Sequence, residues 1–127
     1  MRKTRATLFV VALAAVVAVA APGFAPRRTG QADTPRQIID ITAERFAFTP
    51  SEVKVKAGTA LEIRLRSDDT AHGFHIVGTD VDIELPKRGR GVATVMFTPK
   101  AGRYTFECSR LCGAGHEFMR GVIVASE

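Results

Sequence analysis

Apolar and charged residues alternate along most of the chain from residue 37 onward. In Leu61–Arg66 the odd positions are apolar and the even positions are charged. A period of two places one face in a core and the other in solvent, so this run predicts a half-buried β-strand. Similar runs occur at Ile38–Ile41, Phe46–Phe48, Glu52–Lys56, Gly73–Val77, Val81–Leu85, Val92–Thr98, Arg103–Cys108 and Val122–Val124.

Turn-forming residues separate these runs, as in Thr49-Pro50-Ser51, Ser67-Asp68-Asp69 and Pro99-Lys100-Ala101-Gly102. We expect seven or eight short strands, and their regular spacing predicts an all-β, antiparallel β-sandwich. The length of 127 residues suits one such domain. No stretch beyond the N-terminal segment has helical periodicity, which disfavours α/β enzyme folds.

The N-terminus has the pattern of an export segment. Met1–Arg5 is basic, and Ala6–Ala21 is uncharged and almost wholly apolar. Ala18-Val19-Ala20 offers a small-x-small cleavage site, whereas the uncharged stretch Ala6–Phe24 is marginal for a membrane span of about 20 residues. We therefore expect residues 1–25 to form a hydrophobic helix that acts as a signal peptide or a membrane anchor. Either role exports the domain to the periplasmic or extracytoplasmic face.

Charge is distributed unevenly along the chain. The formal charge is +5, but six of the 18 basic residues and only one acid precede residue 37, so residues 37–127 hold 12 basic and 12 acidic residues. Residues 26–36 combine Pro, Gly and charge and read as a linker, which leaves 37–127 as the folded domain. No run of cations within that domain could exchange with phosphate counterions, so nucleic acid is not an expected partner.

Known catalytic motifs are absent from the sequence. No serine has Gly-x-Ser-x-Gly flanks, and no glycine-rich loop ends in Lys-Ser/Thr. The segment His116–Arg120 begins like a zinc-protease helix but lacks the second histidine. We therefore expect no catalytic residues in this chain.

The segment Cys108–Met119 concentrates soft metal donors. It holds both cysteines of the chain, one of three histidines and one of three methionines, spaced as Cys108, Cys112, His116 and Met119. Thiolate, imidazole and thioether together select copper over hard cations. Two other interpretations remain open, a Cys108–Cys112 disulfide and a zinc site on two cysteines and two histidines.

Two further histidines lie in Asp69–His75, at the start of a predicted strand. Successive side chains of a strand point to opposite faces, so His72 and Phe74 share one face and His75 takes the other. At most one of these histidines can be a ligand of the same site. Phe74, Phe106 and Phe118 are expected in the core, and Met96 is expected to be a packing residue.

These two segments resemble the dinuclear copper (CuA) domains of cytochrome c oxidase subunit II, particularly those of B-type haem-copper oxidases. The resemblance runs from Phe46 to the C-terminus and rests on Asp69–His75 and on Cys-x-x-x-Cys-x-x-x-His-x-x-Met. It implies a cupredoxin-like Greek-key sandwich in which Cys108 and Cys112 bridge two coppers. It further implies that His72 and Met119 complete one copper, and His116 and the carbonyl of Arg110 the other.

The resemblance leaves two functional classes. In the first, the chain is the electron-entry subunit of a terminal oxidase, taking electrons from a c-type cytochrome without chemistry of its own. In the second, it is a stand-alone exported electron carrier or copper-handling protein. Family members often carry glutamate at the position of Arg110, and many take electrons in through a tryptophan, which this chain lacks.

Overall fold

The computed structural model describes residues 35–127. The expected signal or anchor helix and most of the expected linker lie outside the described residues. β1 begins at Arg36, the last residue of that linker. Within residues 35–127, no helix is long and apolar enough to cross a membrane.

The described part of the chain contains nine strands and one short 3-10 helix, η1 (His116–Phe118). The count exceeds the expected seven or eight because the three-residue run after Phe46 forms a separate strand, antiparallel to β1. Each run of alternating residues contains a strand. The strands are β1 (Arg36–Glu44), β2 (Ala47–Thr49), β3 (Glu52–Lys56), β4 (Ala60–Ser67), β5 (His72–Ile76), β6 (Asp82–Leu85), β7 (Ala93–Phe97), β8 (Gly102–Glu107) and β9 (Arg120–Ser126).

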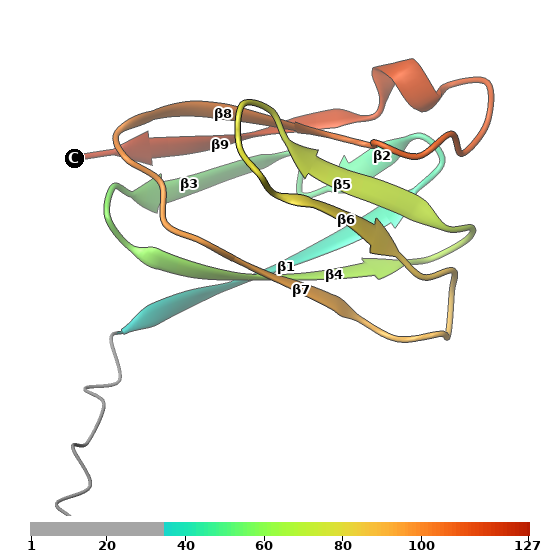
Figure 1. Cartoon of the computed structure of the whole chain (residues 1–127), viewed down its shortest axis with the longest axis horizontal. Helices are drawn as coiled ribbons and strands as arrows, with labels where there is room; N and C mark the ends of the chain where they lie inside the picture. Colours follow the sequence, from blue (N-terminus) through green and yellow to red (C-terminus); the bar gives the residue numbers. More distant parts are fainter. Residues whose placement is uncertain (1–34) are drawn as a thin grey trace, which may run out of the picture. The chain divides into compact units, whose positions relative to one another are not determined.

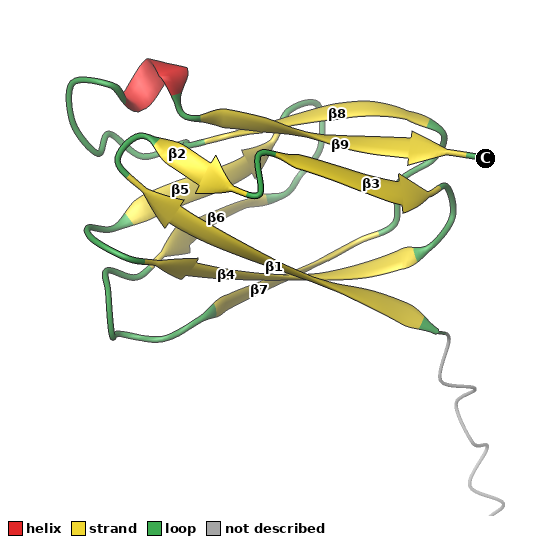
Figure 2. Ribbon diagram, turned by 180° about the vertical axis from the view of Figure 1, so that it is seen from behind, coloured by secondary structure: helices red, strands yellow, loops and turns green. Residues whose placement is uncertain are grey.

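The strands form two sheets, in the orders β2-β1-β4-β7 and β3-β9-β8-β5-β6 (Figures 1 and 2). This arrangement confirms the expected all-β sandwich. Five pairings are antiparallel, but β1 with β4 and β3 with β9 run parallel. The expectation of an antiparallel sandwich is wrong for these two pairs, because in each the chain visits the other sheet before it returns.

The core lies between the sheets and follows the alternation seen in the sequence. Leu61, Ile63 and Leu65 of β4 are at most 1% exposed. Phe74 and Phe106 come from the other sheet, and Phe48 of β2 packs edge to face against both rings, with centroids 5.8 and 5.3 Å apart. Edge-to-face pairs of this kind stabilise a core beyond the area they bury.

Two expected core residues are instead on the surface. Phe118 is 76% exposed and Met96 is 54% exposed. Phe118 is the last residue of the turn η1, which has no buried residue. Met96 lies opposite Glu62 on the outward face of the β4–β7 pair. The prediction that both residues pack in the core is therefore wrong. It rested on their hydrophobic character alone, but the local backbone points both side chains away from the core.

Candidate metal centre

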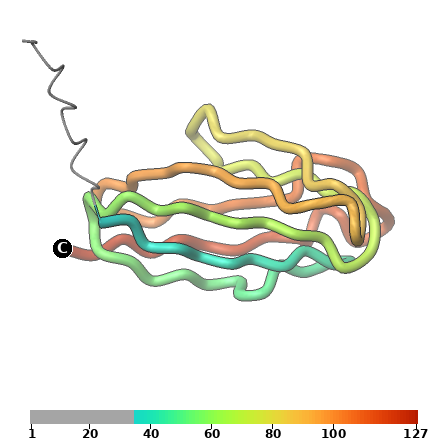
Figure 3. The backbone as a smooth tube through the Cα atoms, turned by 90° about the horizontal axis from the view of Figure 1, so that it is seen from below, coloured from blue at the N-terminus to red at the C-terminus, as the bar shows by residue number. Residues whose placement is uncertain are grey.

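Four loops meet at one end of the sandwich. The strands run between two ends of the folded part (Figure 3). The pairing directions place the ends of β1, β4, β6 and β8 at the same end, together with the starts of the strands that follow them. The connections β1–β2, β4–β5, β6–β7 and β8–β9 are therefore neighbours, although they come from all parts of the sequence.

The two cysteines lie at this end and are both buried. Cys108 directly follows β8, and Cys112 lies four residues later in the β8–β9 loop. Their sulfurs are 3.7 Å apart. A disulfide requires about 2.05 Å, so the cysteines are free thiols and the disulfide interpretation is not realised. At this separation both sulfurs can bind the same metal ion, because each metal–sulfur bond is about 2.3 Å long.

Two donors lie beside Cys108. The Nδ1 atom of His72, at the start of β5, is 3.8 Å from the Cys108 sulfur. The carbonyl oxygen of Arg110 is 3.1 Å from the same sulfur. Sγ of Cys108, Sγ of Cys112 and a ring nitrogen of His72 all lie within 4.8 Å of one another. The structure thus groups these three side chains as a potential metal site.

Two other donors lie beside Cys112. Nδ1 of His116 is 3.9 Å from the Cys112 sulfur, and Sδ of Met119 is also 3.9 Å from it. Met119 is fully buried, whereas His116 is partly exposed. All six residues named from the sequence therefore lie around the pair of sulfurs, three of them in the tighter group.

His75 lies on the opposite face of β5 from His72 and is only partly buried. Its Nδ1 is 2.9 Å from the carbonyl oxygen of Val81. The strand alternation predicted from the sequence thus separates the two histidines, and only His72 faces the cysteines.

Asp69 fixes the orientation of His72. Its Oδ1 is 2.7 Å from Nε2 of His72, and its Oδ2 accepts a hydrogen bond from the backbone N–H of Arg45 at 3.0 Å. Burial alone would raise the pKa of Asp69, but the hydrogen bonds from His72, Arg45 and Thr70 outweigh it and lower this pKa to about 2. An ionised carboxylate only accepts, so Nε2 donates, and in the neutral ring Nδ1 then keeps its lone pair and faces the cysteines.

Arg45 braces the cysteine loop from the β1–β2 turn. Its Nε donates to the carbonyl oxygen of Cys112 at 2.9 Å. The next residue, Phe46, lies under the same loop, and a Cβ added to Gly115 would come within 2.3 Å of its ring. Neither Asp69 nor Arg45 was expected from the sequence to have a role of its own at the site. The place of Asp69 three residues before His72 is the one signal that could have indicated its role.

Gly73 lets the cysteine loop approach β5 closely. A Cβ at this position would lie 2.2 Å from Oγ of Ser109 and 2.7 Å from the backbone nitrogen of Arg110. Its own N–H points toward the Cys108 sulfur, at 3.5 Å. The histidine segment and the cysteine loop therefore pack together with no room for a side chain between them.

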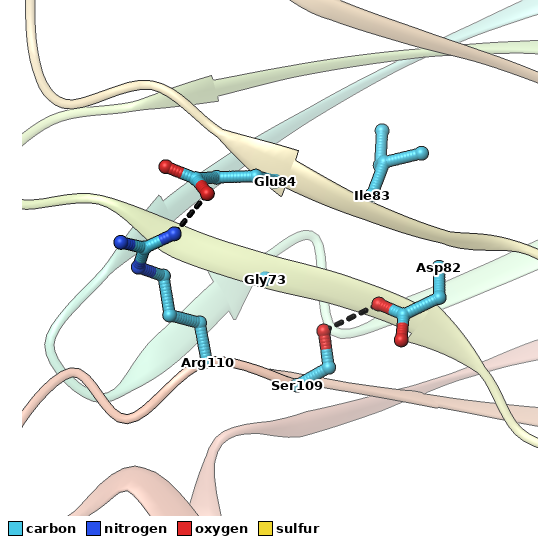
Figure 4. A pocket seen from close by; sticks show the side chains of 6 residues that line it. All are labelled: Gly73, Asp82, Ile83, Glu84, Ser109 and Arg110. Carbon is cyan, nitrogen blue, oxygen red and sulfur yellow. Dashed lines mark hydrogen bonds and ion pairs between the residues drawn. The ribbon is translucent and has the colours of Figure 1, made fainter.

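Two side-chain contacts hold the cysteine loop to the edge strand β6 (Figure 4). Ser109 donates to Asp82 at 2.6 Å, and Arg110 forms an ion pair with Glu84. Arg110 thus uses its side chain within the domain, while its carbonyl faces Cys108.

The environment of Cys112 keeps its thiol protonated when no metal is bound. Burial raises the pKa of Cys112 to about 11, and the hydrogen bond and the charge of Cys108 add to this effect. A metal ion must therefore displace protons to bind thiolate here, which couples metal binding to proton release.

The fold and the donor set define a cupredoxin, and the model of the cupredoxin-like domain family matches residues 8–125. The chain belongs to this family. It is homologous to cytochrome c oxidase subunit 2 of Thermus thermophilus, to which it is 37% identical over 89 residues, covering 68% of this chain and 64% of that protein. The chain thus spans less than two thirds of this relative.

Solved structures agree with this relationship. A subunit of a haem-copper terminal oxidase dimer superposes with a TM-score of 0.67 and 26% identity, covering 84% of this chain and 76% of that one. The periplasmic domain of cytochrome oxidase subunit II of Bradyrhizobium japonicum has the same fold, with a TM-score of 0.65, 21% identity and coverage of 74% and 88%. The family and the homology support copper as the metal.

Proposed function

We propose that this chain is a dinuclear copper electron-transfer domain that accepts single electrons from a c-type cytochrome and passes them to a haem-copper terminal oxidase. One observation carries the proposal. The two buried cysteine sulfurs are 3.7 Å apart, and each has two further donors beside it. His72 and the Arg110 carbonyl lie beside Cys108, and His116 and Met119 lie beside Cys112. A mononuclear site would not need all six donors.

The donor chemistry fits copper rather than a hard cation. Two thiolates, two imidazoles and a thioether are soft ligands, and a weak thioether or carbonyl donor tunes potential. When bound, a pair of coppers sharing two thiolates supplies a one-electron redox centre. We assign the six donors as its ligands, with Cys108 and Cys112 shared.

The residues of this chain hold that centre rigid and dry. His72 and Met119 are fully buried and the cysteines are at most 7% exposed, so water has little access to these four residues. Asp69 fixes the ring of His72, and Arg45 holds the carbonyl of Cys112. Because the donors are already held in place, little rearrangement is needed when an electron arrives.

An apolar surface beside the site suits electron entry. Leu111 is 81% exposed and Phe118 is 76% exposed, and each directly precedes a ligand, Cys112 and Met119 respectively. We place the electron donor at this end of the domain, where the route to the copper ligands is short, and the oxidase as the acceptor in line with the homology.

The N-terminal segment completes the proposal. Residues 1–25 would export the domain and serve as a signal peptide or an anchor, with 26–36 as the tether of the domain 37–127. The periplasmic location stated for the related Bradyrhizobium domain is consistent with this topology.

The test is copper content and spectroscopy of the purified protein reconstituted under reducing conditions. We expect two copper ions per chain and, in the mixed-valence state, an electron-spin signal with coupling to both copper nuclei. A signal from a single copper, or stoichiometric zinc with copper excluded, would contradict the dinuclear assignment. Efficient transfer of its copper to an apoprotein, with negligible cytochrome oxidation, would instead favour the copper-handling alternative.

A further inference from the structure

Three cationic side chains converge on a surface recess next to the metal centre. Arg45 comes from the β1–β2 turn, and Lys87 and Arg88 come from the β6–β7 loop. Together with Asp69 and Thr70 they line one recess. We call Arg45, Lys87 and Arg88 the cationic rim. All three are exposed.

Positive charge is in excess at the rim, because within residues 35–127 its three cations share the recess with one acid, Asp69. No carboxylate lies in ion-pair range of the three side chains there. Asp69, the acid of the recess, already accepts hydrogen bonds from His72, Thr70 and the backbone of Arg45. By contrast, Arg110 and Arg120 at the same end are paired with Glu84 and Glu107.

The rim is directly connected to the proposed ligands. Nε of Arg45 donates to the carbonyl of Cys112, and the backbone N–H of Arg88 donates to the carbonyl of Asp69 at 3.2 Å. Asp69 in turn holds His72. A protein seated on the rim would therefore lie one or two residues from the metal ligands.

From these observations we propose that the cationic rim docks an electron-transfer protein with an acidic face. The inference rests on the proposed function and adds where the partner docks and that the docking surface is positively charged. Residues 37–127 have equal numbers of acidic and basic residues, so orientation must come from local asymmetry. Glu44 and Glu117 are exposed at this end, but neither lines the recess. Clustered charge of one sign raises association rates with partners of the opposite sign by about 10- to 1000-fold at low salt.

The test is stopped-flow reduction of the copper-loaded full chain by two reduced c-type cytochromes of similar potential, one acidic and one basic, across a range of ionic strength. We expect the acidic cytochrome to react faster at low salt, with a rate that falls as salt rises. The double variant Lys87→Glu/Arg88→Glu should slow the acidic cytochrome about 10-fold or more and flatten its salt dependence. Neither side chain contacts a proposed ligand, so the copper spectrum should be unchanged.

The matched control is Lys100→Glu/Arg103→Glu, which changes the net charge equally. Both residues are exposed and lie near the start of β8, whose length separates Arg103 from Cys108 by roughly 17 Å. This control should alter the rate less than about twofold. An equal effect of both double variants, no effect of the rim variant, or a faster reaction with the basic cytochrome would overturn the proposal.

Two further measurements separate this proposal from its alternatives. The first is co-sedimentation of the chain with anionic phosphatidylglycerol vesicles. If the rim variant no longer sediments with the vesicles but is reduced by the acidic cytochrome as fast as the wild type, the rim binds a membrane surface and protein docking is refuted. Binding of the metal-free chain to immobilised acidic cytochrome tests docking without electron transfer. If binding requires the rim but no cytochrome reduces the loaded protein, docking stands and the proposed function fails.

Discussion

The contact between Asp69 and His72 shows how one carboxylate can prepare a metal ligand. The short hydrogen bond at 2.7 Å determines which ring nitrogen carries the proton and which one faces the cysteines. The same carboxylate binds the backbone of Arg45, whose side chain holds the carbonyl of Cys112. The two ligand-bearing segments are therefore tied together through Asp69 and Arg45.

Asp69→Ala should weaken copper binding about 10- to 100-fold, because His72 loses its orientation and its preferred tautomer. Competition titration with a copper chelator measures the affinity, and the electron-spin spectrum shows whether the histidine coupling changes. The matched control is Asp68→Ala, since Asp68 interacts with Arg66 and touches none of the proposed ligands. Equal affinities of the wild type and Asp69→Ala would show that the carboxylate plays no positioning role.

Substitution of the donors should give graded effects. Cys108→Ser or Cys112→Ser should abolish the mixed-valence spectrum, His72→Ala or His116→Ala should distort it, and Met119→Leu should mainly shift the reduction potential. His75→Ala should leave the spectrum intact, because its ring binds the carbonyl of Val81 on the other face of β5. Loss of copper from His75→Ala but not from His72→Ala would show that the wrong histidine had been assigned.

At the scale of the elements, β5 and the β8–β9 loop act as one unit. Gly73 brings them into contact with no space for a side chain. Ser109 and Arg110 hold the far side of the loop to β6 through Asp82 and Glu84. The position of the cysteines thus depends on strands β5 and β6 as much as on the loop's own sequence.

Gly73→Ala should displace the cysteine loop and alter the copper spectrum, because the new Cβ would clash with the backbone of Arg110. Gly78→Ala is the comparison. Gly78 has a φ of 81° and open space around it, so alanine there should cost about 1–2 kcal/mol of stability and leave the spectrum unchanged. Thermal unfolding and absorption spectra of the two variants separate the effects, and an unaltered spectrum in Gly73→Ala would contradict the packing argument.

At the scale of the whole domain, the sandwich gathers four loops at one end, and the one group of three potential metal donors found among residues 35–127 lies there. Five of the proposed ligands come from the β8–β9 connection and His72 is the first residue of β5, while Asp69 of the β4–β5 loop and Arg45 of the β1–β2 turn hold them in place. This separation of scaffold from site lets the strands provide stability while the loops set the chemistry.

The copper-loaded chain by itself should take up no oxygen, because all six donors are used as ligands and catalysis would need an open coordination position. It should still be reduced rapidly and reversibly by a c-type cytochrome. An oxygen electrode and stopped-flow spectroscopy measure the two properties on one preparation. Oxygen consumption by the pure protein would show that the site is open.

The sequence by itself determined the strand pattern and the donor spacing. Alternation at Leu61–Arg66 gave the buried face of β4, and the same period of two separated His72 from His75. These features could be predicted because strand geometry depends only on neighbouring residues. The segment Cys108–Met119 likewise holds its donors within twelve residues.

Only the tertiary structure decided what surrounds those donors. The parallel pairing of β1 with β4 brings the turn at Arg45 beside the loop of Asp69, 24 residues away in sequence, and Arg45 also reaches Cys112, 67 residues away. The common recess of Arg45, Lys87 and Arg88 has the same origin. No local pattern encodes such contacts, because they depend on where whole strands end once both sheets have packed.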